Sequence, residues 1–469
     1  MRRSGMLAAV TLLIAQTVSA QESRIASDLR RQKELIADAC DTFSLKPLGE
    51  CVYTLFTSSP LHIAAGNQPP QNGFAFGLAF SERWTPNESW RITWSADAVT
   101  TFAGSWRAGA YAKFIRTPGT SGVSVAPAGT PASTSVAITP RPVPVFDVFL
   151  QSISLETLSF YGTGMDSTRE NRTIFGQTQT IVGGSAFYPI GARALAALRP
   201  ALVGGIQLRV IDIKDGRGSF PAIGQEFPPA SLPGLADQDP FTQFTEGIRL
   251  KPSFGNGAVS LNYLLSSQQF RTSANSHGSF VRWTADLRHE FPLYRRVAST
   301  GPRDFNSPNE CATSAGSGAC PPLQFSRNRE GAITIRALVI GASVSETNQV
   351  PFYLQPTLGG SDLNGDRLLA GYDDYRFRGP NLVAVQEGIE HSLWGPVGVF
   401  VTLEQGAVAE RFHEFRFNDV AHSATVGLTL RAGGFPMVNL AFAFGGETHR
   451  VIATMDASLL GGSRRPSLF

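Results

Sequence analysis

Apolar and polar side chains alternate with a period of two residues along the C-terminal part of this chain. In residues 437–444, Val, Leu and Phe occupy every second position, and Asn or Ala lies between them. Segments 424–430 and 450–457 alternate in the same way. This period places successive side chains on opposite faces of a β-strand. Strands joined by so few residues pair as antiparallel neighbours, so we predict an antiparallel sheet here.

The same alternation begins near residue 73 and continues through most of the sequence. We predict strands at 74–81, 91–98, 106–114, 145–160, 173–189, 197–212, 241–251, 257–270, 278–292, 331–345, 382–393, 396–406, 424–430, 437–444 and 450–457. These are about fifteen strands, and bacterial membrane barrels have an even number, so we expect about sixteen. Residues 51–65 are the expected place of the strand that the pattern misses.

The apolar rows face either lipid or the core of a soluble protein. In 281–288 the second face carries Arg282, Thr284, Asp286 and Arg288, which suits a water-filled lumen. Long connections at 117–143, 213–240, 295–330 and 346–381 are mixed with short turns, as in outer-membrane barrels. A secreted all-β protein of two sandwich domains is the alternative, but it requires a break in the strand series that the pattern lacks. We therefore predict an all-β fold, a transmembrane antiparallel β-barrel of about sixteen strands.

The N-terminal residues indicate export. Arg2 and Arg3 precede an apolar run, and small residues at 18–20 form a cleavage site, so residues 1–20 are predicted to be a signal peptide. Residues 21–70 are expected to be a periplasmic segment with a short amphipathic helix at 22–39, which leans on the barrel rim or docks a partner. Residues 71–469 form the predicted outer-membrane barrel. No later window approaches about 18 consecutive apolar residues, which excludes a membrane-spanning helix.

Composition agrees with a barrel and narrows the list of partners. Charged residues are 16% of the chain, against about 25% in an ordinary soluble domain. The net charge of +3 comes without a basic run, so we expect no nucleic-acid partner. The expected partners are outer-membrane lipid, the assembly machinery that inserts the barrel, and a polypeptide or small-solute substrate. We expect a monomer in the bacterial outer membrane.

The four cysteines occur as two close pairs. Cys40 lies near Cys51, and Cys311 lies near Cys320 in a segment rich in Gly and Ser. In an oxidising compartment each pair is predicted to form a local disulfide. Neither pair has the spacing of a metal site, and we predict no metal or cofactor.

A long connection at 351–381 carries the most specific signal in the sequence. Together with the two strands that follow, it resembles the BamA/TamA superfamily of outer-membrane barrels, also called bacterial surface antigens. Residues 160–173 also look like a loop common in short members of that family. The positions that carry the resemblance are Leu358, Gly359 and Gly360, the signature Leu369, Ala370, Gly371 and Tyr372, the tail Arg376, Phe377 and Arg378, and the strand positions Glu404 and Gly406.

The chain departs from the family at two places. The resemblance implies a signature arginine that enters the lumen and pairs with strand acids, but this sequence has Ala370 there, while Glu404 is retained. A buried unpaired carboxylate is costly, so we expect Arg367, Arg376 or Arg378 to pair with Glu404, with Arg376 first. Residues 21–70 are also too few for the POTRA domains of assembly members, so the chain resembles a short member without them.

Other chemistry receives little support from the sequence. Asp362–Asp366 with Asp373 and Asp374 resembles part of a calcium loop, but we expect these acids to be solvated. No two of the seven histidines lie four residues apart, and nucleophile-elbow and phosphate-loop motifs are absent, so we expect no enzyme and no catalytic residues. The resemblance implies a role in outer-membrane protein assembly or in polypeptide or solute passage. The alternative is a passive pore or structural barrel that has lost assembly activity.

Overall fold

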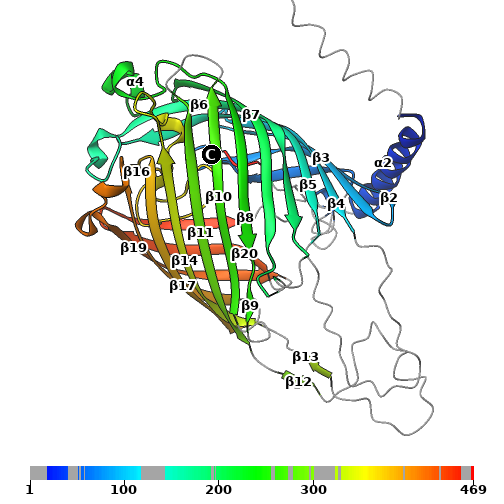
Figure 1. The fold of residues 1–469 in the computed structure, drawn as a ribbon. Helices are drawn as coiled ribbons and strands as arrows, with labels where there is room; N and C mark the ends of the chain where they lie inside the picture. The colour runs from blue at the N-terminus through cyan, green and yellow to red at the C-terminus, as the bar shows by residue number, and fades with distance from the viewer. Residues whose placement is uncertain are drawn as a thin grey trace, which may run out of the picture.

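The structure is a computed structural model that describes residues 18–40, 51, 54–56, 59–117, 143–191, 195, 197–254, 259–272, 278–294, 297–299, 323–325, 329–394, 397–432, 435–455 and 466–468. One large antiparallel sheet curls into a barrel (Figure 1). Its strands are β1 (Leu61–Asn67), β2 (Phe74–Asn87), β3 (Trp90–Thr101), β4 (Trp106–Arg116), β5 (Val145–Phe160), β6 (Thr173–Pro189), β7 (Ala201–Asp215), β8 (Phe241–Leu250), β9 (Ser253–Phe254), β10 (Val259–Thr272), β11 (Phe280–Tyr294), β14 (Arg329–Ser343), β17 (Asn381–Trp394), β18 (Val397–Ala409), β19 (Ala421–Ala432), β20 (Phe435–Gly445) and β21 (His449–Met455).

The number of wall strands agrees with the expectation from the sequence. The sheet contains 17 labelled strands, but β8 and β9 pair with successive parts of β10 and are one interrupted strand, which leaves 17 − 1 = 16. The strand that the pattern missed is β1, which pairs with β2 from Leu61↔Phe80 to Asn67↔Phe74. Because the sheet is continuous, the alternative of two sandwich domains is wrong.

The two faces of the strands differ as the alternation predicts. On β20, the side chain of Phe442 is 53% exposed, whereas its neighbours Ala441 and Ala443 are 0% exposed. Exposed apolar side chains continue around the outer surface on most strands, for example Leu208 on β7 and Trp283 on β11. The apolar rows therefore point outward, and the small and polar rows point into the lumen.

Antiparallel order divides the connections between two rims. The loop rim carries 68–73, 102–105, 161–172, 216–240, 344–380, 410–420 and 446–448. The opposite rim is where β1 begins, where β21 ends, and where the connections after β4 and β11 leave the wall. The wall strands that flank the long connections predicted at 117–143 and 295–330 have their facing ends on this opposite rim. Within them, β12 (Val297–Ser299) and β13 (Leu323–Phe325) form a separate two-stranded ladder.

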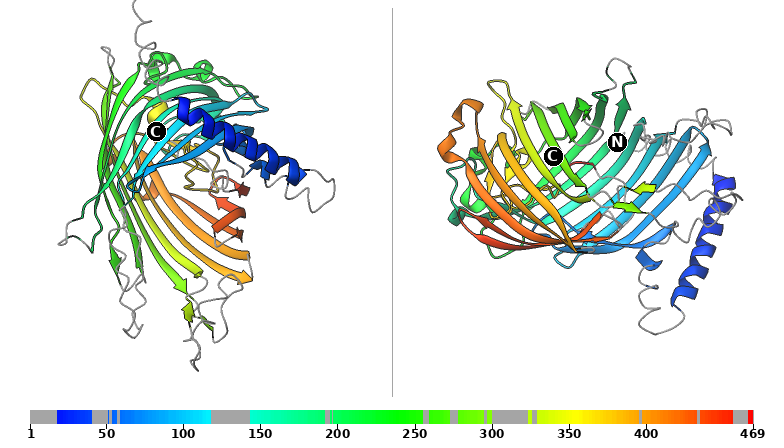
Figure 2. Two further views of the ribbon diagram at one scale, coloured as in Figure 1. Left: turned by 90° about the vertical axis from the view of Figure 1, so that its right-hand side faces the viewer. Right: turned by 90° about the horizontal axis from the view of Figure 1, so that it is seen from below.

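A helix precedes the barrel and lies outside its wall (Figure 2). This helix, α2 (Val18–Cys40), confirms the helix expected at 22–39. The side chain of Gln32 donates to the carbonyl of Leu61 and accepts from its N–H. It therefore satisfies both backbone polar groups of the first residue of β1. Cys40 and Cys51 form the predicted disulfide, whereas Cys311 and Cys320 lie outside the described residues. In the described part of the chain, no helix has the length and apolar character needed to cross a membrane.

The interior of the barrel is filled in part by its own loops. One apolar cluster packs Phe352, Tyr353 and Leu354 against inward-facing residues of β5, β6 and β7. A second packs the signature residues Leu369 and Tyr372 against β17, β18 and β19. Short helical turns, α4 (Ile223–Glu226) among them, lie in the connections at the loop rim. The core of this protein is therefore the contact between the lumen wall and the segments inside it.

Candidate functional site

The connection between β14 and β17 folds into the lumen and is called the lumen loop here, residues 344–380. Its side chains are among the most buried in the molecule: Phe352 and Leu369 are 0% exposed and Ala370 is 1% exposed. Two short strands, β15 (Thr357–Leu358) and β16 (Phe377–Arg378), pair within it. The loop is thus a folded unit that lies inside the barrel.

The pair Gly359-Gly360 makes a turn that other residues cannot make. Both have positive φ, 104° and 57°. A Cβ atom at Gly359 would lie 2.6 Å from Cβ of Arg376, and one at Gly360 would lie 2.0 Å from Oδ1 of Asp374. The turn therefore packs residues 359–360 against residues 373–376 of the same loop, and only glycine leaves room for this contact.

The signature residues are attached to the wall through their backbone. The N–H of Ala370 donates to Oε2 of Glu404 at 2.6 Å, and Nε2 of Gln386 donates to Oε1 of Glu404 at 2.7 Å. The N–H of Gly371 donates to Oγ of Ser423 at 2.8 Å. Glu404 is 3% exposed. A hydrogen bond from an N–H group to a carboxylate is charge-assisted and stronger than one between neutral groups. Glu404 therefore binds this loop without a signature arginine.

Gly371 is as tightly fitted as the paired glycines. A Cβ atom there would lie 2.2 Å from the backbone N of Gly445 and from the carbonyl carbon of Phe444, at the end of β20. This contact packs the signature residues 369–372 against the end of β20. Leu369 holds a positive φ of 58°, which is uncommon for a residue with a side chain and persists only where the surroundings hold it.

The expectation that Arg376 pairs with Glu404 is wrong. Arg376 donates to both carboxylate oxygens of Glu447, at 2.7 and 2.6 Å, and to Ser167. Arg378 donates to the backbone carbonyl of Phe352 at 2.8 Å. The third candidate, Arg367, meets the same Gln386 side chain through its backbone: Nε2 of Gln386 donates to the carbonyl of Arg367 at 3.4 Å. The backbone contact from Ala370 explains why Glu404 does not need Arg376.

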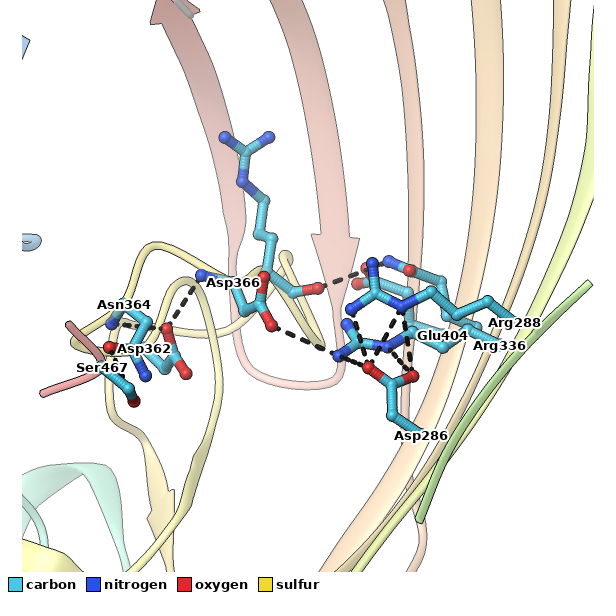
Figure 3. A network of polar contacts seen from close by, with 10 residues as sticks. Asp286, Arg288, Arg336, Asp362, Asn364, Asp366, Glu404 and Ser467 are labelled. Carbon is cyan, nitrogen blue, oxygen red and sulfur yellow. Dashed lines mark hydrogen bonds and ion pairs between the residues drawn. The ribbon is translucent and has the colours of Figure 1, made fainter. Parts of the chain in front are cut away.

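Two of the loop acids are largely shielded from solvent, which is a second correction. The side chains of Asp373 and Asp374 are 19% and 13% exposed, whereas that of Asp366 is 55% exposed, as expected. Asp366 pairs with Arg336 at 3.2 Å, Asp373 with Arg169 at 2.7 Å, and Asp374 with Arg450 at 3.0 Å. These arginines come from β14, the 161–172 connection and β21. Arg336 also pairs with Asp286, which Arg288 contacts in turn, so Asp366 joins a network on the lumen wall (Figure 3).

Asp362 has a different task within the same turn. Its Oδ1 accepts the backbone N–H groups of Asn364 and Asp366, each at 2.8 Å, and this closes a tight turn. Burial raises the pKa of the Asp362 carboxyl, and the Asp366 carboxylate raises it further, to about 7. Asp362 lies in the lumen loop, outside the wall strands. In the described residues, no group of three or more His, Cys, Asp and Glu is placed to hold a metal ion.

Arginines that point into the lumen bond the irregular backbone of the lumen loop. Arg378 bonds the carbonyl of Phe352, Arg450 bonds that of Tyr372 at 2.6 Å, and Arg282 of β11 bonds that of Leu354. Non-helical backbone at membrane depth is tolerated only where protein or water satisfies its polar groups. Arginine suits this role because it carries five N–H donors in a fixed geometry.

The lumen loop contacts both ends of the strand order. The hydroxyl of Tyr375 donates to the carbonyl of Pro70, in the β1–β2 turn, at 3.4 Å. At the other end, Arg376 reaches Glu447 in the β20–β21 turn, and Asp374 reaches Arg450. No ladder pairing joins β1 to β21 in the strands that the structure describes. The loop is therefore a bridge between the first and last parts of the wall.

The second segment noted in the sequence, 160–173, meets the lumen loop. The N–H of Gly164 donates to the carbonyl of Arg378 at 2.8 Å, and Ser167 and Arg169 bond Arg376 and Asp373. Sequence reasoning did not find these contacts, nor the arginine partners on the wall. Their signal was present as arginines on the polar faces of strands, at Arg282, Arg336 and Arg450.

A cavity of about 1150 Å³ remains beside the lumen loop. It is lined by residues of β1–β4, by Asp286 and Arg288 of β11, by the loop residues 361 and 363–367, and by Pro466, Ser467 and Leu468. Its lining mixes polar and charged side chains with small apolar ones. Such a space holds water or a small polar molecule, and a folded domain cannot enter it.

Comparisons with known proteins find similarity only in structure. No family model matches the sequence, and no curated protein matches it. CdiB from Acinetobacter baumannii aligns with 11% identity and a TM-score of 0.44, covering 85% of this chain and 56% of that one. CdiB from Escherichia coli aligns with 10% identity and a TM-score of 0.47, covering 85% and 61%. BamA from Haemophilus ducreyi lacking POTRA domains 1–3 aligns with 8% identity and a TM-score of 0.48, covering 84% and 70%. The chain thus spans less than two thirds of the two CdiB structures.

Proposed function

We propose that the protein is a short bacterial outer-membrane barrel of the BamA/TamA superfamily, and that it aids the insertion or passage of polypeptide at that membrane. The observation that carries the proposal is the lumen loop, which binds Glu404 through the signature backbone and reaches both ends of the sheet. A passive porin needs no such bridge. A barrel that handles polypeptide needs a loop that holds the lumen closed and can rearrange.

The outer surface supports the location in a membrane. Exposed Phe, Leu, Val and Trp side chains face outward on strands around the sheet, and their neighbours are small or buried. Soluble monomers rarely expose apolar area of this extent. An apolar outer face with a polar interior is the pattern of outer-membrane barrels. Lipid is therefore the proposed partner of this face.

The departure at Ala370 does not remove the loop from the lumen. Glu404 accepts the Ala370 N–H, and the ion pairs of Asp366, Asp373 and Asp374 hold the loop at three further places. The chain has thus replaced one side-chain tether by several others. This supports a specialised member of the family over a barrel whose loop has lost its role.

The cavity favours a second candidate, a barrel that passes small solutes. Its volume of about 1150 Å³ and its charged lining of Asp286, Arg288 and Arg450 suit polar molecules. In this reading, the loop sets the width and charge of a pore. Polypeptide insertion and solute passage then differ in whether the loop must move.

Reconstitution separates the two candidates. Proteoliposomes that contain the purified protein are offered an unfolded outer-membrane barrel protein, and its folding is followed by protease resistance. Polypeptide insertion predicts faster folding than in empty liposomes. Gly360→Val, which collides with Asp374, should lose this acceleration, whereas Gly224→Val, with nothing within 4 Å of its added Cβ, should keep it. Uptake of a small polar solute without any acceleration would overturn the proposal in favour of the pore.

A further inference from the structure

Residues 466–468, close to the C-terminal end of the sequence, lie inside the barrel. Figure 3 shows Ser467 beside Asn364 of the lumen loop. Asn364 is in the tight turn of the lumen loop that Asp362 closes. The two segments therefore meet in the lumen although Asn364 and Leu468, which contact each other, are 104 residues apart in the sequence.

Most hydrogen bonds between the rest of the barrel and residues 466–468 involve the backbone of these residues. Nη2 of Arg209, on β7, donates to the carbonyl of Ser467 at 3.0 Å, and Nε2 of Gln179, on β6, donates to that of Leu468 at 3.4 Å. The N–H of Leu468 donates to Oδ1 of Asn364 at 2.8 Å, and the Ser467 hydroxyl donates to the same oxygen at 3.3 Å. Arg209 is 0% exposed and Gln179 is 1% exposed, so these donors are built into the wall.

The side chain of Leu468 adds an apolar anchor. It is 7% exposed and belongs to the cluster that contains Ile181, Ile211 and Leu363. Burying this side chain removes apolar surface from water, which favours the bound position of the segment. Backbone bonds fix the direction of the segment, and Leu468 fixes its position along the wall.

The two segments follow wall strands that end on opposite rims. The lumen loop leaves the wall at the end of β14 and returns at the start of β17, both on the loop rim. Strand β21 starts at the loop rim and ends at the opposite rim, so residues 466–468 follow a strand end on that side. Residues 466–468 meet the lumen loop at Asn364, beside the cavity that both segments line.

We propose that residues 466–468 are a plug that binds a lumen site made by Gln179, Arg209 and Asn364, and that release of this plug opens the lumen from the mouth opposite the lumen loop. The site recognises an extended backbone with one aliphatic side chain, and the chain itself supplies the ligand. This device is independent of what the open lumen then carries, so it stands or falls separately from the proposed function.

Cross-linking tests the position of the plug. The variant Asn364→Cys/Ser467→Cys, reconstituted in lipid, is treated with a short thiol-reactive cross-linker and analysed by mass spectrometry. The expected result is a 364–467 cross-link in most molecules. The matched control Leu265→Cys/Ser467→Cys, in which residue 265 is an outward-facing, 44% exposed position of β10, should give none. Equal yields from both pairs, or no 364–467 product, would overturn the proposal.

Conductance in planar bilayers tests whether the plug closes the lumen. Leu468→Glu places a charge in the apolar cluster and should raise the mean conductance severalfold, because the segment leaves its site. Gly224→Glu adds the same charge at an open position of the loop rim and should leave conductance unchanged. The cross-linked Asn364→Cys/Ser467→Cys protein should stay at the low level. If the cross-link forms but Leu468→Glu conducts like the parent, the segment is a static strap and the plug is disproved.

Discussion

The backbone N–H of Ala370 and the carboxylate of Glu404 form a 2.6 Å hydrogen bond in the buried interior of the barrel. The resemblance to the BamA/TamA superfamily implies an arginine at this position, yet the loop here is bound by main chain. Gln386 donates to the other oxygen of the same carboxylate, so Glu404 has partners on both sides. The acid therefore keeps a tethering geometry although its expected partner side chain is absent.

Removing this acid should loosen the lumen loop. Glu404→Ala leaves the buried Ala370 N–H and the Gln386 amide without their acceptor, which costs about 1–3 kcal/mol for each unsatisfied group. Glu404→Gln keeps an oxygen for the Ala370 N–H and should cost less. The measurement is the protease sensitivity of the loop in reconstituted protein, with intact wild type as the reference. Equal sensitivity of Glu404→Ala and wild type would show that the bond does not hold the loop.

Arg376 and Glu447 should form a stabilising ion pair. The sequence analysis expected this role for Arg376 and Glu404. Arg376→Glu leaves Glu447 opposite a second acid, and breaking a buried pair costs about 3–5 kcal/mol, less here because Glu447 is partly exposed. The exchange Arg376→Glu/Glu447→Arg should restore much of the loss in urea unfolding from lipid. The double variant Arg376→Glu/Glu404→Lys should not. Rescue by the second exchange and not the first would contradict the observed geometry.

The turn at Asp362 should make the loop sensitive to pH. Its pKa is raised to about 7 by burial and by Asp366, while Arg336 acts in the opposite direction. The folded loop therefore holds a proton that the unfolded chain has lost, and stability falls as pH rises between about 4 and 7. Loop protection from protease should be greater at the acidic end of this window. Asp362→Asn keeps the oxygen that closes the turn and should flatten this dependence; an unchanged slope would assign it to another group.

The outward row on β20 should be in contact with lipid. Phe442→Arg should cost roughly 2–4 kcal/mol if the residue lies near the bilayer midplane, and should block barrel assembly. Asn439→Ser, on the inward face of the same strand, should be mild. Heat-modifiable migration in gels of membrane fractions reports the folded barrel. Normal migration of both variants would contradict a lipid-facing Phe442.

Much of the fold followed from the period-two pattern because each strand has one apolar and one small or polar face. The weakest strand, β1, was found only by the requirement for an even number, because its sequence LHIAAGN has few large apolar residues. Gly359, Gly360 and Glu404 were identified by resemblance. In the structure the two glycines form a tight turn, and Glu404 accepts a hydrogen bond from the loop.

The partners inside the lumen were not predictable in the same way. Which arginine meets which acid depends on how a loop of irregular backbone folds, and no local pattern encodes it. Arg376 was assigned to Glu404 and instead binds Glu447, and Asp373 and Asp374 were assigned to solvent although both are ion-paired and largely shielded. Residues 466–468 gave no signal at all, because three residues carry no periodicity.

Single-channel conductance of the purified wild-type protein in planar bilayers tests the central claim most directly, that this is a membrane barrel whose lumen is held by its own loop. The account predicts small, flickering events, and larger openings in Gly360→Val, whose added side chain displaces the loop. Large, steady channels from the wild type, unchanged by Gly360→Val, would contradict it.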